Sequence, residues 1–196
     1  MFWLGNWLEG VIIIRDKIIS AFIELAKTRG LCKITMDELA AQTGISKRTI
    51  YNYFRSKDEV LEAVVDKMIE ELGAAIDILL SKNKKPSEVF NQIPEVFLRI
   101  SEDILPPLAL SDLNQYYPRF WRRIDEFRLA KLGMVIKKLL ENTDNQVIRD
   151  IDHRIITVAM LASLQAVANP EFILNNNLTL EYTVHDLSKF FKNIFG

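Results

Sequence analysis

The stretch from Thr35 to Glu59 constrains the fold most strongly, because it contains start or stop signals for three consecutive helices. Thr35 and Glu38 have the spacing of a capping box, in which the hydroxyl and the carboxylate each accept a backbone N–H. Gly44 predicts the end of this helix, since glycine adopts a left-handed turn without a Cβ penalty. We therefore expect one short helix between Thr35 and Gly44, with both ends fixed by local chemistry.

Two further helix starts follow at once. Ser46 is placed to cap a second helix, with Ile45 before it and Ile50 inside it available as a hydrophobic staple. Ser56 and Glu59 repeat the capping-box spacing and predict a third helix. A helix, a glycine turn and a second helix in this order are typical of a helix-turn-helix, whose second helix enters the major groove of DNA.

The second predicted helix has a polar outer surface. Ile50 and Phe54 are four residues apart and share its inward face. The remaining circumference is cationic, hydroxylated and aromatic, and it carries Lys47, Arg48, Thr49, Tyr51, Asn52 and Tyr53. Such side chains on an exposed helix are suited to contacts with DNA bases and phosphates.

Residues 15–67 resemble the DNA-binding domain of the tetracycline-repressor (TetR) family of bacterial transcriptional regulators. The resemblance lies in the run T-M-D-E-L-A-A-Q-T-G-I-S-K-R-T-I-Y-N-Y-F-R-S-K-D-E-V-L, which begins at Thr35. It implies that some side chains face bases or nearby phosphates, namely Lys47, Arg48 and Thr49. It also implies that others hold the DNA backbone, namely Thr35, Tyr51, Tyr53 and Lys57. With Ser46 and Asn52, these residues make up the predicted DNA-binding surface.

A structural helical hairpin with solvated charges and core tyrosines is the alternative interpretation of this stretch. A glycine turn alone would favour that alternative. The three caps, the staples and the family run together favour DNA binding.

Positive charge is concentrated in the same part of the chain. The formal net charge of the 196 residues is −1, which gives no overall attraction to nucleic acid. Between Lys27 and Lys57, however, there are seven basic and two acidic residues, whereas residues 68–196 carry 15 basic and 17 acidic ones. The distribution places the cationic surface on the predicted helix-turn-helix.

The first residues lack the features of a targeting segment. Residues 1–14 contain no Lys or Arg, and Asn6 and Glu9 interrupt an apolar run that is too short to cross a bilayer. We interpret them as an N-terminal extension before a helix that starts at about Arg15. The single cysteine, Cys32, excludes an intramolecular disulfide and suits a reducing cytoplasm. We expect a cytoplasmic protein without a membrane partner.

The rest of the chain is predicted to be helical. Apolar spacing predicts helices over 15–29, 57–81, 87–104, 118–139, 151–168 and 180–195, with a short one ending at Tyr116 and Thr179 as the last cap. Pro94 is expected to kink or split the third of these, and Pro170 to make a turn. The fold class is therefore all-α, with a helix-turn-helix domain at 15–60 and a helical effector-binding and dimerisation domain at 61–196.

The last two major helices are predicted to form a homodimer interface. The penultimate helix has small side chains on one side, at Ala159, Ala162, Ser163 and Ala166, and the last has an apolar seam of Leu187, Phe190, Phe191 and Ile194. Small side chains let helices approach closely, and the resembled family dimerises through a four-helix interface. A homodimer would read a palindromic operator. The alternative is that both helices pack only within the subunit.

The resemblance also implies a small apolar effector bound between the middle helices. The candidates are aromatic, methionine and glutamine side chains at helical spacing, namely Phe90, Phe97, Tyr116, Trp121, Phe127, Met160 and Gln165. Ordinary core packing is the alternative for each of them. No cofactor is expected, and the identity of the effector does not follow from the sequence.

An enzyme is the rival class, and the residues do not favour it. His153 and His185 are far apart and lack a second ligand at metal spacing, and Cys32 has no adjacent base. The sequence has no phosphate loop, nucleophile elbow or HExxH motif. We predict a DNA-binding transcriptional regulator, with repression as the family default. A DNA-bound architectural or scaffolding protein of the same fold, without an effector, is the alternative.

Overall fold

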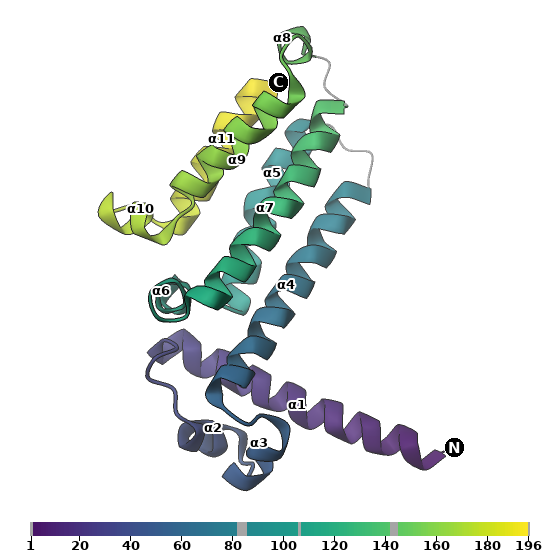
Figure 1. Cartoon of the computed structure of the whole chain (residues 1–196), viewed down its shortest axis with the longest axis vertical. Helices are drawn as coiled ribbons and strands as arrows, with labels where there is room; N and C mark the ends of the chain where they lie inside the picture. Colours follow the sequence, from purple (N-terminus) through teal and green to yellow (C-terminus); the bar gives the residue numbers. More distant parts are fainter. Residues whose placement is uncertain (1, 82–85, 106, 142–144, 196) are drawn as a thin grey trace. The chain divides into compact units, whose positions relative to one another are not determined.

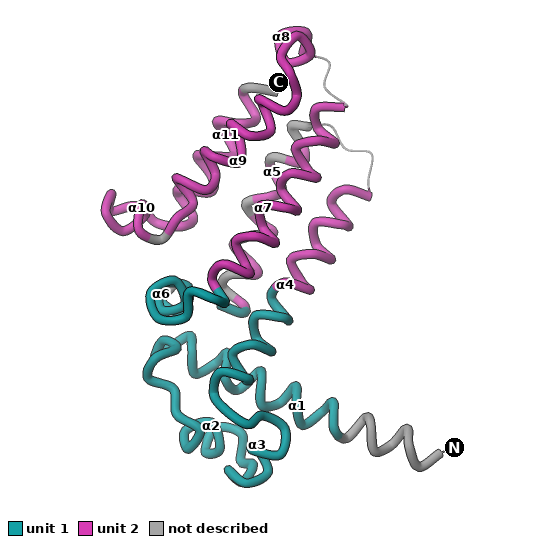
Figure 2. The backbone as a smooth tube through the Cα atoms, in the orientation of Figure 1, with its two compact units in different colours: residues 1–68, 104–120 teal, residues 69–103, 121–196 magenta. Residues whose placement is uncertain are grey.

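A computed structural model describes the backbone of residues 2–81, 86–105, 107–141 and 145–195. Side chains in these ranges are described except at positions 2–10, 86, 87, 90, 94, 97, 101, 102, 107, 170, 194 and 195. Every regular element in the described ranges is an α-helix, as predicted (Figure 1). The chain divides into unit 1, residues 1–68 and 104–120, and unit 2, residues 69–103 and 121–196 (Figure 2).

Unit 1 is a helical domain with its own core. It contains α1 (Phe2–Arg29), α2 (Met36–Thr43), α3 (Lys47–Tyr53), the first part of α4 (Lys57–Ser81) and α6 (Pro107–Tyr116). Its fully buried side chains include Ile18, Phe22, Leu31, Leu39, Ile50, Phe54, Leu61 and Leu113. Burying a side chain of this size contributes about 1.5–3 kcal/mol. The inward face predicted for α3 is therefore confirmed.

The first helix is longer than the sequence indicated. α1 begins at Phe2, whereas we expected a start near Arg15. No proline interrupts this part of the chain, and an interior glycine such as Gly5 or Gly10 costs only about 1 kcal/mol relative to alanine, so the helix continues towards the N-terminus. Ile12 and Ile13 remain 56% and 66% exposed. This part of α1 therefore contributes little to the core of unit 1.

Unit 2 consists of helices packed along one another. It contains the rest of α4, α5 (Pro86–Asp103), most of α7 (Pro118–Glu141), α8 (Gln146–Arg149), α9 (His153–Val167), α10 (Pro170–Asn175) and α11 (Leu180–Phe195). α5 packs against α11, and α11 also contacts α9 and α10. α4 and α7 run side by side in unit 2, where Lys131 and Asp77 form an ion pair at 2.6 Å (Figure 1). Unit 2 is thus a helical bundle.

Two prolines that were expected to interrupt the chain lie within helices. Of the two outcomes expected at Pro94, a kink or a split, the split does not occur, because α5 continues from Pro86 to Asp103. A proline inside a helix costs about 3 kcal/mol, which the packing of α5 on α11 offsets. The turn predicted at Pro170 is the short helix α10, because Asn169 caps it and proline suits its first turn. The predicted cap of α11 is confirmed, since Thr179 Oγ1 accepts the Tyr182 N–H at 3.1 Å.

Gly30 and Gly44 end α1 and α2 with left-handed backbones, at φ +73° and +67°. A Cβ built at Gly44 would meet no atom within 4 Å, whereas one at Gly30 would lie 2.6 Å from Asp112 Oδ2. That oxygen accepts the Cys32 N–H at 3.2 Å. We predict that Gly44→Ala lowers the free energy of unfolding by about 1–2 kcal/mol through its backbone alone. Gly30→Ala should cost about 1 kcal/mol more, because Asp112 would lose a hydrogen bond.

Urea denaturation followed by circular dichroism measures both free energies of unfolding. Gly44→Asn is the control for backbone strain, and it should destabilise less than Gly44→Ala because asparagine tolerates the left-handed region. Equal losses for Gly30→Ala and Gly44→Ala would show that the Asp112 contact does not stabilise the loop.

Candidate nucleic-acid interface

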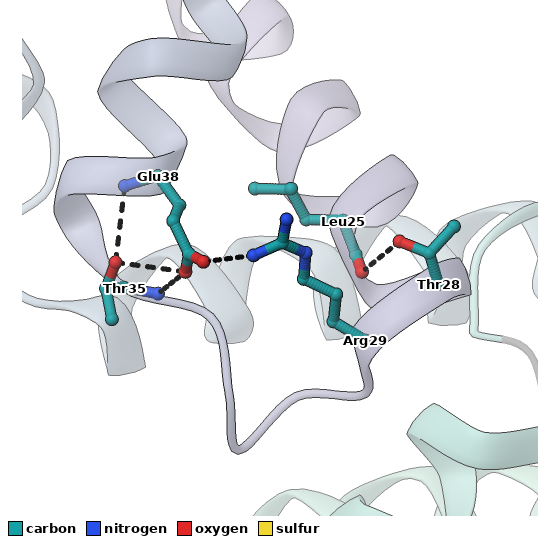
Figure 3. A network of polar contacts seen from close by, with 5 residues as sticks. All are labelled: Leu25, Thr28, Arg29, Thr35 and Glu38. Carbon is teal, nitrogen blue, oxygen red and sulfur yellow. Dashed lines mark hydrogen bonds and ion pairs between the residues drawn. The ribbon is translucent and has the colours of Figure 1, made fainter.

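The predicted capping box fixes the start of α2. Thr35 Oγ1 accepts the Glu38 N–H at 3.2 Å, and Glu38 Oε2 accepts the Thr35 N–H at 3.0 Å. Arg29, at the end of α1, ion-pairs with Glu38 Oε1 (Figure 3). The Thr35 backbone N–H is the largest cause that holds the pKa of Glu38 below its usual value, and the Thr35 hydroxyl adds to it. The end of α1 and the start of α2 are thus joined through one carboxylate.

The start of α3 is fixed in a similar way. Ser46 Oγ accepts the Thr49 N–H at 3.1 Å and lies 2.8 Å from Thr49 Oγ1. At the other end, the Phe54 N–H donates to the Ile50 carbonyl at 2.9 Å while the Phe54 backbone turns extended. The helix that carries the predicted DNA contacts is therefore short and closed at both ends.

The outer surface of α3 carries the side chains that the sequence singled out. Lys47, Arg48, Tyr51 and Asn52 are exposed, and Thr49 and Tyr53 are half-buried. Within the described part of the chain, Arg48 makes no hydrogen bond or ion pair. Its guanidinium is accordingly available to a nucleic acid.

Lys47 already has a partner on α2. Its Nζ lies 2.8 Å from a carboxylate oxygen of Asp37, and this hydrogen bond raises the pKa of Lys47. Both side chains are largely exposed, so the pair is screened by solvent and contributes little to stability. A phosphate could therefore replace Asp37 at small cost.

Lys57 serves the fold of unit 1. Its Nζ donates to the carbonyl oxygens of Leu31 and Cys32, at 3.2 and 3.3 Å, and lies 5.9 Å from the ring centroid of Tyr117. The sequence did not indicate this role. Any phosphate that Lys57 contacts must share the ammonium with the loop between α1 and α2.

The third capping box differs from expectation in one bond. Ser56 Oγ accepts the Glu59 N–H at 3.2 Å, as predicted. The Glu59 carboxylate accepts the N–H of Arg55 at 2.7 Å, one residue before the expected cap N–H. The start of α4 is nevertheless satisfied by local side chains.

Two contacts within unit 1 could not be anticipated from local sequence. Asp112 on α6 accepts the N–H of Cys32, which is 80 residues earlier in the chain. Arg119 pairs with Asp58 of α4 at 3.0 Å. Both carboxylates looked like ordinary surface charges, because their partners are remote in sequence.

The side chains predicted to bind an effector divide into several groups. Met160 lines an apolar cavity inside unit 2. Gln165 and Tyr116 are exposed, and Trp121 and Phe127 are half-buried but do not line the cavity. The side chains of Phe90 and Phe97 lie outside the described residues. The cavity wall is mainly aliphatic, which is a composition that ordinary core also has, so the sequence could not distinguish the two.

The side chains predicted to form the dimer interface also divide. Ala159, Ala162 and Ala166 are exposed on α9, and half-buried Ser163 donates to the Ala159 carbonyl at 2.8 Å. On α11, Phe190 is 56% exposed.

Leu187 and Phe191, by contrast, line the cavity, and Phe191 is only 3% exposed. They are four residues apart and share one face of α11, whereas Phe190 lies about 100° around the helix from Phe191. The residues predicted to form one apolar seam on α11 therefore lie on two different faces of the helix, one towards the cavity and one exposed. The side chain of Ile194 lies outside the described residues.

Two other features are absent from the described part of the chain. It contains no cluster of three or more His, Cys, Asp or Glu side chains that could hold a metal ion. None of its helices is long and apolar enough to cross a membrane.

A capped helix-turn-helix with an exposed cationic second helix, followed by a helical bundle, defines a DNA-binding regulator of the helix-turn-helix class. Residues 18–64 match the family described as bacterial regulatory proteins, tetR family. The match covers the helix-turn-helix, which is therefore similar to the DNA-binding domain of the TetR family of transcriptional regulators.

The relatives extend the likeness beyond the helix-turn-helix. The chain is 28% identical over 165 residues to the uncharacterized HTH-type transcriptional regulator YvaF of Bacillus subtilis, covering 83% of this chain and 85% of YvaF. It is 30% identical over 89 residues to the nucleoid occlusion factor SlmA of Vibrio campbellii, which is 45% of each chain. A TetR transcription regulator from Haloarcula marismortui shares the fold, with a TM-score of 0.70 and 18% identity over 92% of this chain and 97% of that one.

Proposed function

We propose that the protein is a dimeric repressor that leaves its operator when a small apolar ligand occupies the cavity of unit 2. The observation that carries the proposal is the cavity itself, which α4, α5, α7, α9 and α11 all line. The empty space within it, which includes open solvent at its mouth, is about 910 Å³. An architectural DNA-binding protein of the same fold has no use for such a cavity.

The likeness to YvaF supports a regulator more than the likeness to SlmA supports a nucleoid-bound factor. The first match covers 85% of the relative and the second only 45%. The shorter match adds no argument about the helical bundle.

The ligand and the operator are expected to bind antagonistically. α4 is one continuous helix that contributes residues to both units, so it is the proposed route of coupling. Because coupling is reciprocal and typically about 1–3 kcal/mol, the ligand should weaken operator binding roughly 5- to 150-fold, and the operator should weaken ligand binding equally. Fluorescence anisotropy with labelled operator, titrated with a ligand found by thermal-shift screening, measures the factor.

A reporter gene behind the operator tests the sign of regulation. Expression should be low with the protein and should rise when the ligand is added. Equal ligand affinity with and without saturating operator would exclude the allosteric part of the proposal.

We propose that the DNA-binding surface divides between base and backbone contacts. Lys47, Arg48 and Thr49 are assigned to bases or adjacent phosphates. The backbone contacts are assigned to Thr35, Tyr51, Tyr53 and Lys57, and Ser46 and Asn52 belong to the same surface. The exposure of Arg48 and its lack of a partner in the described residues support the first assignment.

The division predicts two kinds of mutant. Arg48→Ala should relax preference at particular operator positions, since one bidentate base contact discriminates by about 1–3 kcal/mol. Lys57→Ala should weaken all sequences alike and flatten the salt dependence by roughly 0.9 per phosphate contact, or about twice that in a dimer. Selection from a random DNA pool, followed by titration at several salt concentrations, measures both effects.

Two controls separate the loss of DNA contacts from other effects of the substitutions. Arg122→Ala removes an exposed arginine from α7 and should change neither base preference nor salt slope. Urea denaturation of Lys57→Ala shows how much of its effect comes from losing the Leu31 and Cys32 contacts. A Lys57→Ala protein with altered base preference and an unchanged salt slope would contradict the backbone assignment.

We also propose that the exposed face of α9 and part of α11 form the dimer interface. Ala159, Ala162 and Ala166 lie on α9 together with Ile155 and Val158, which are 64% and 66% exposed. Small residues beside exposed aliphatic ones allow a helix from a second copy to approach closely and to bury apolar surface. The exposed Phe190 ring extends this surface onto α11.

Ala162→Glu should weaken dimerisation at least a hundredfold and operator binding with it. An uncompensated charge buried at an interface costs about 3–5 kcal/mol, and the symmetry copy would bring a second carboxylate to the same surface. Analytical ultracentrifugation measures the dimer dissociation constant. Ala130→Glu, at an exposed alanine of α7, is the matched control. A folded Ala162→Glu protein that stays fully dimeric would remove this face from the interface.

A further inference from the structure

Arg128 is a buried cation on the wall of the apolar cavity. The side chain is on α7 and only 8% of it is exposed. Its Nη1 donates to the Ala168 carbonyl at 3.1 Å, and its Nη2 lies 2.5 Å from Asp125 Oδ1. Its Nε is also buried and has no hydrogen-bond acceptor among the described residues. Both terminal nitrogens of this cavity-lining residue thus have a partner, whereas its Nε–H has none in the described part of the chain.

A buried donor without an acceptor is unfavourable, because it gives up hydration and gains no bond in return. A water molecule is poorly suited to supply the acceptor here, since a buried water needs about two to four polar partners. Among the described residues that line the cavity, Ser188 has the only other polar side chain. An oxygen atom carried by an otherwise apolar ligand meets the requirement better, because apolar contacts hold the rest of that molecule.

The charges of Arg128 and Asp125 indicate which kind of ligand oxygen would accept the Nε–H. Asp125 already neutralises the guanidinium through a close ion pair. A second anion at Arg128 would be repelled by Asp125 and would lose its hydration among aliphatic side chains. A neutral carbonyl oxygen avoids both penalties and still accepts an N–H bond.

We infer that this cavity binds an uncharged, largely apolar molecule with one carbonyl-type oxygen, which accepts the Nε–H of Arg128. The inference rests on the proposed function in that it takes the cavity to be the effector site. It adds the chemical class of the ligand and the residue that recognises it. Arg128 was not among the side chains that the sequence singled out.

Three probes of equal chain length test the inference on the full-length protein. They are methyl decyl ketone, dodecane and dodecanoate, and isothermal titration calorimetry measures their affinities. The ketone should bind about tenfold more tightly than dodecane, as one net hydrogen bond allows. Dodecanoate should bind no more tightly than the ketone, since its charge would face Asp125.

Nuclear magnetic resonance provides a readout that does not depend on a variant folding. In nitrogen-15-labelled protein the Nε–H signal of Arg128 should move downfield with the ketone and stay in place with dodecane. Arg128→Lys retains a cation beside Asp125 but removes Nε–H, so it identifies the signal and should reduce the preference for the ketone to twofold or less. Arg122→Lys, at an exposed position of the same helix, should retain the full preference.

The outcomes separate this inference from the proposed function. Equal affinities for ketone and dodecane with an unmoved Nε–H signal would overturn the inference and leave a purely apolar effector in place. Tightest binding of dodecanoate would overturn the neutral class, and failure of all three probes to bind would overturn the inference as well. Preferential ketone binding with no effect on operator affinity would support the inference and contradict ligand-induced release.

Discussion

The ammonium group of Lys57 is the contact on which the arrangement of unit 1 depends. It bonds the carbonyl oxygens of Leu31 and Cys32, in the loop between α1 and α2, while the Cys32 N–H is held from the other side by Asp112 of α6. A loop of this kind has no ladder of its own, so its backbone groups need outside partners. With the loop held, the Thr35 cap lies where α2 must start, and α3 follows one glycine turn later.

The two units are stabilised by different means. In unit 1, α2 and α3 are short, and side-chain caps and tight turns determine where each one begins and ends. In unit 2, α5, α7, α9 and α11 are longer, and burial along their length dominates, as the uninterrupted α5 shows at Pro94. The first arrangement presents a small surface with precise geometry. The packing in unit 2 leaves a cavity whose shape is determined by several helices. A ligand bound there would therefore alter the packing of these helices and not their caps.

The sequence predicted features that depend on residues within one helical turn of each other. The caps at Thr35, Ser46 and Thr179, and the left-handed turn at Gly44, belong to this class. It did not predict the bonds of Lys57, because their acceptors are backbone oxygens far away in the chain. Leu187 and Phe190 looked alike as apolar residues, and only tertiary packing places one at the cavity and leaves the other exposed.

In the free protein the carboxylate of Asp37 pairs with the ammonium group of Lys47, so it competes with DNA phosphates for that group. In the proposed complex, every phosphate that Lys47 binds must first displace a carboxylate, and it gains correspondingly less. That loss is the same for all DNA sequences, whereas base contacts are gained only at the operator. The carboxylate therefore lowers the affinity for operator and for bulk chromosomal DNA by the same small factor, without changing which bases are preferred.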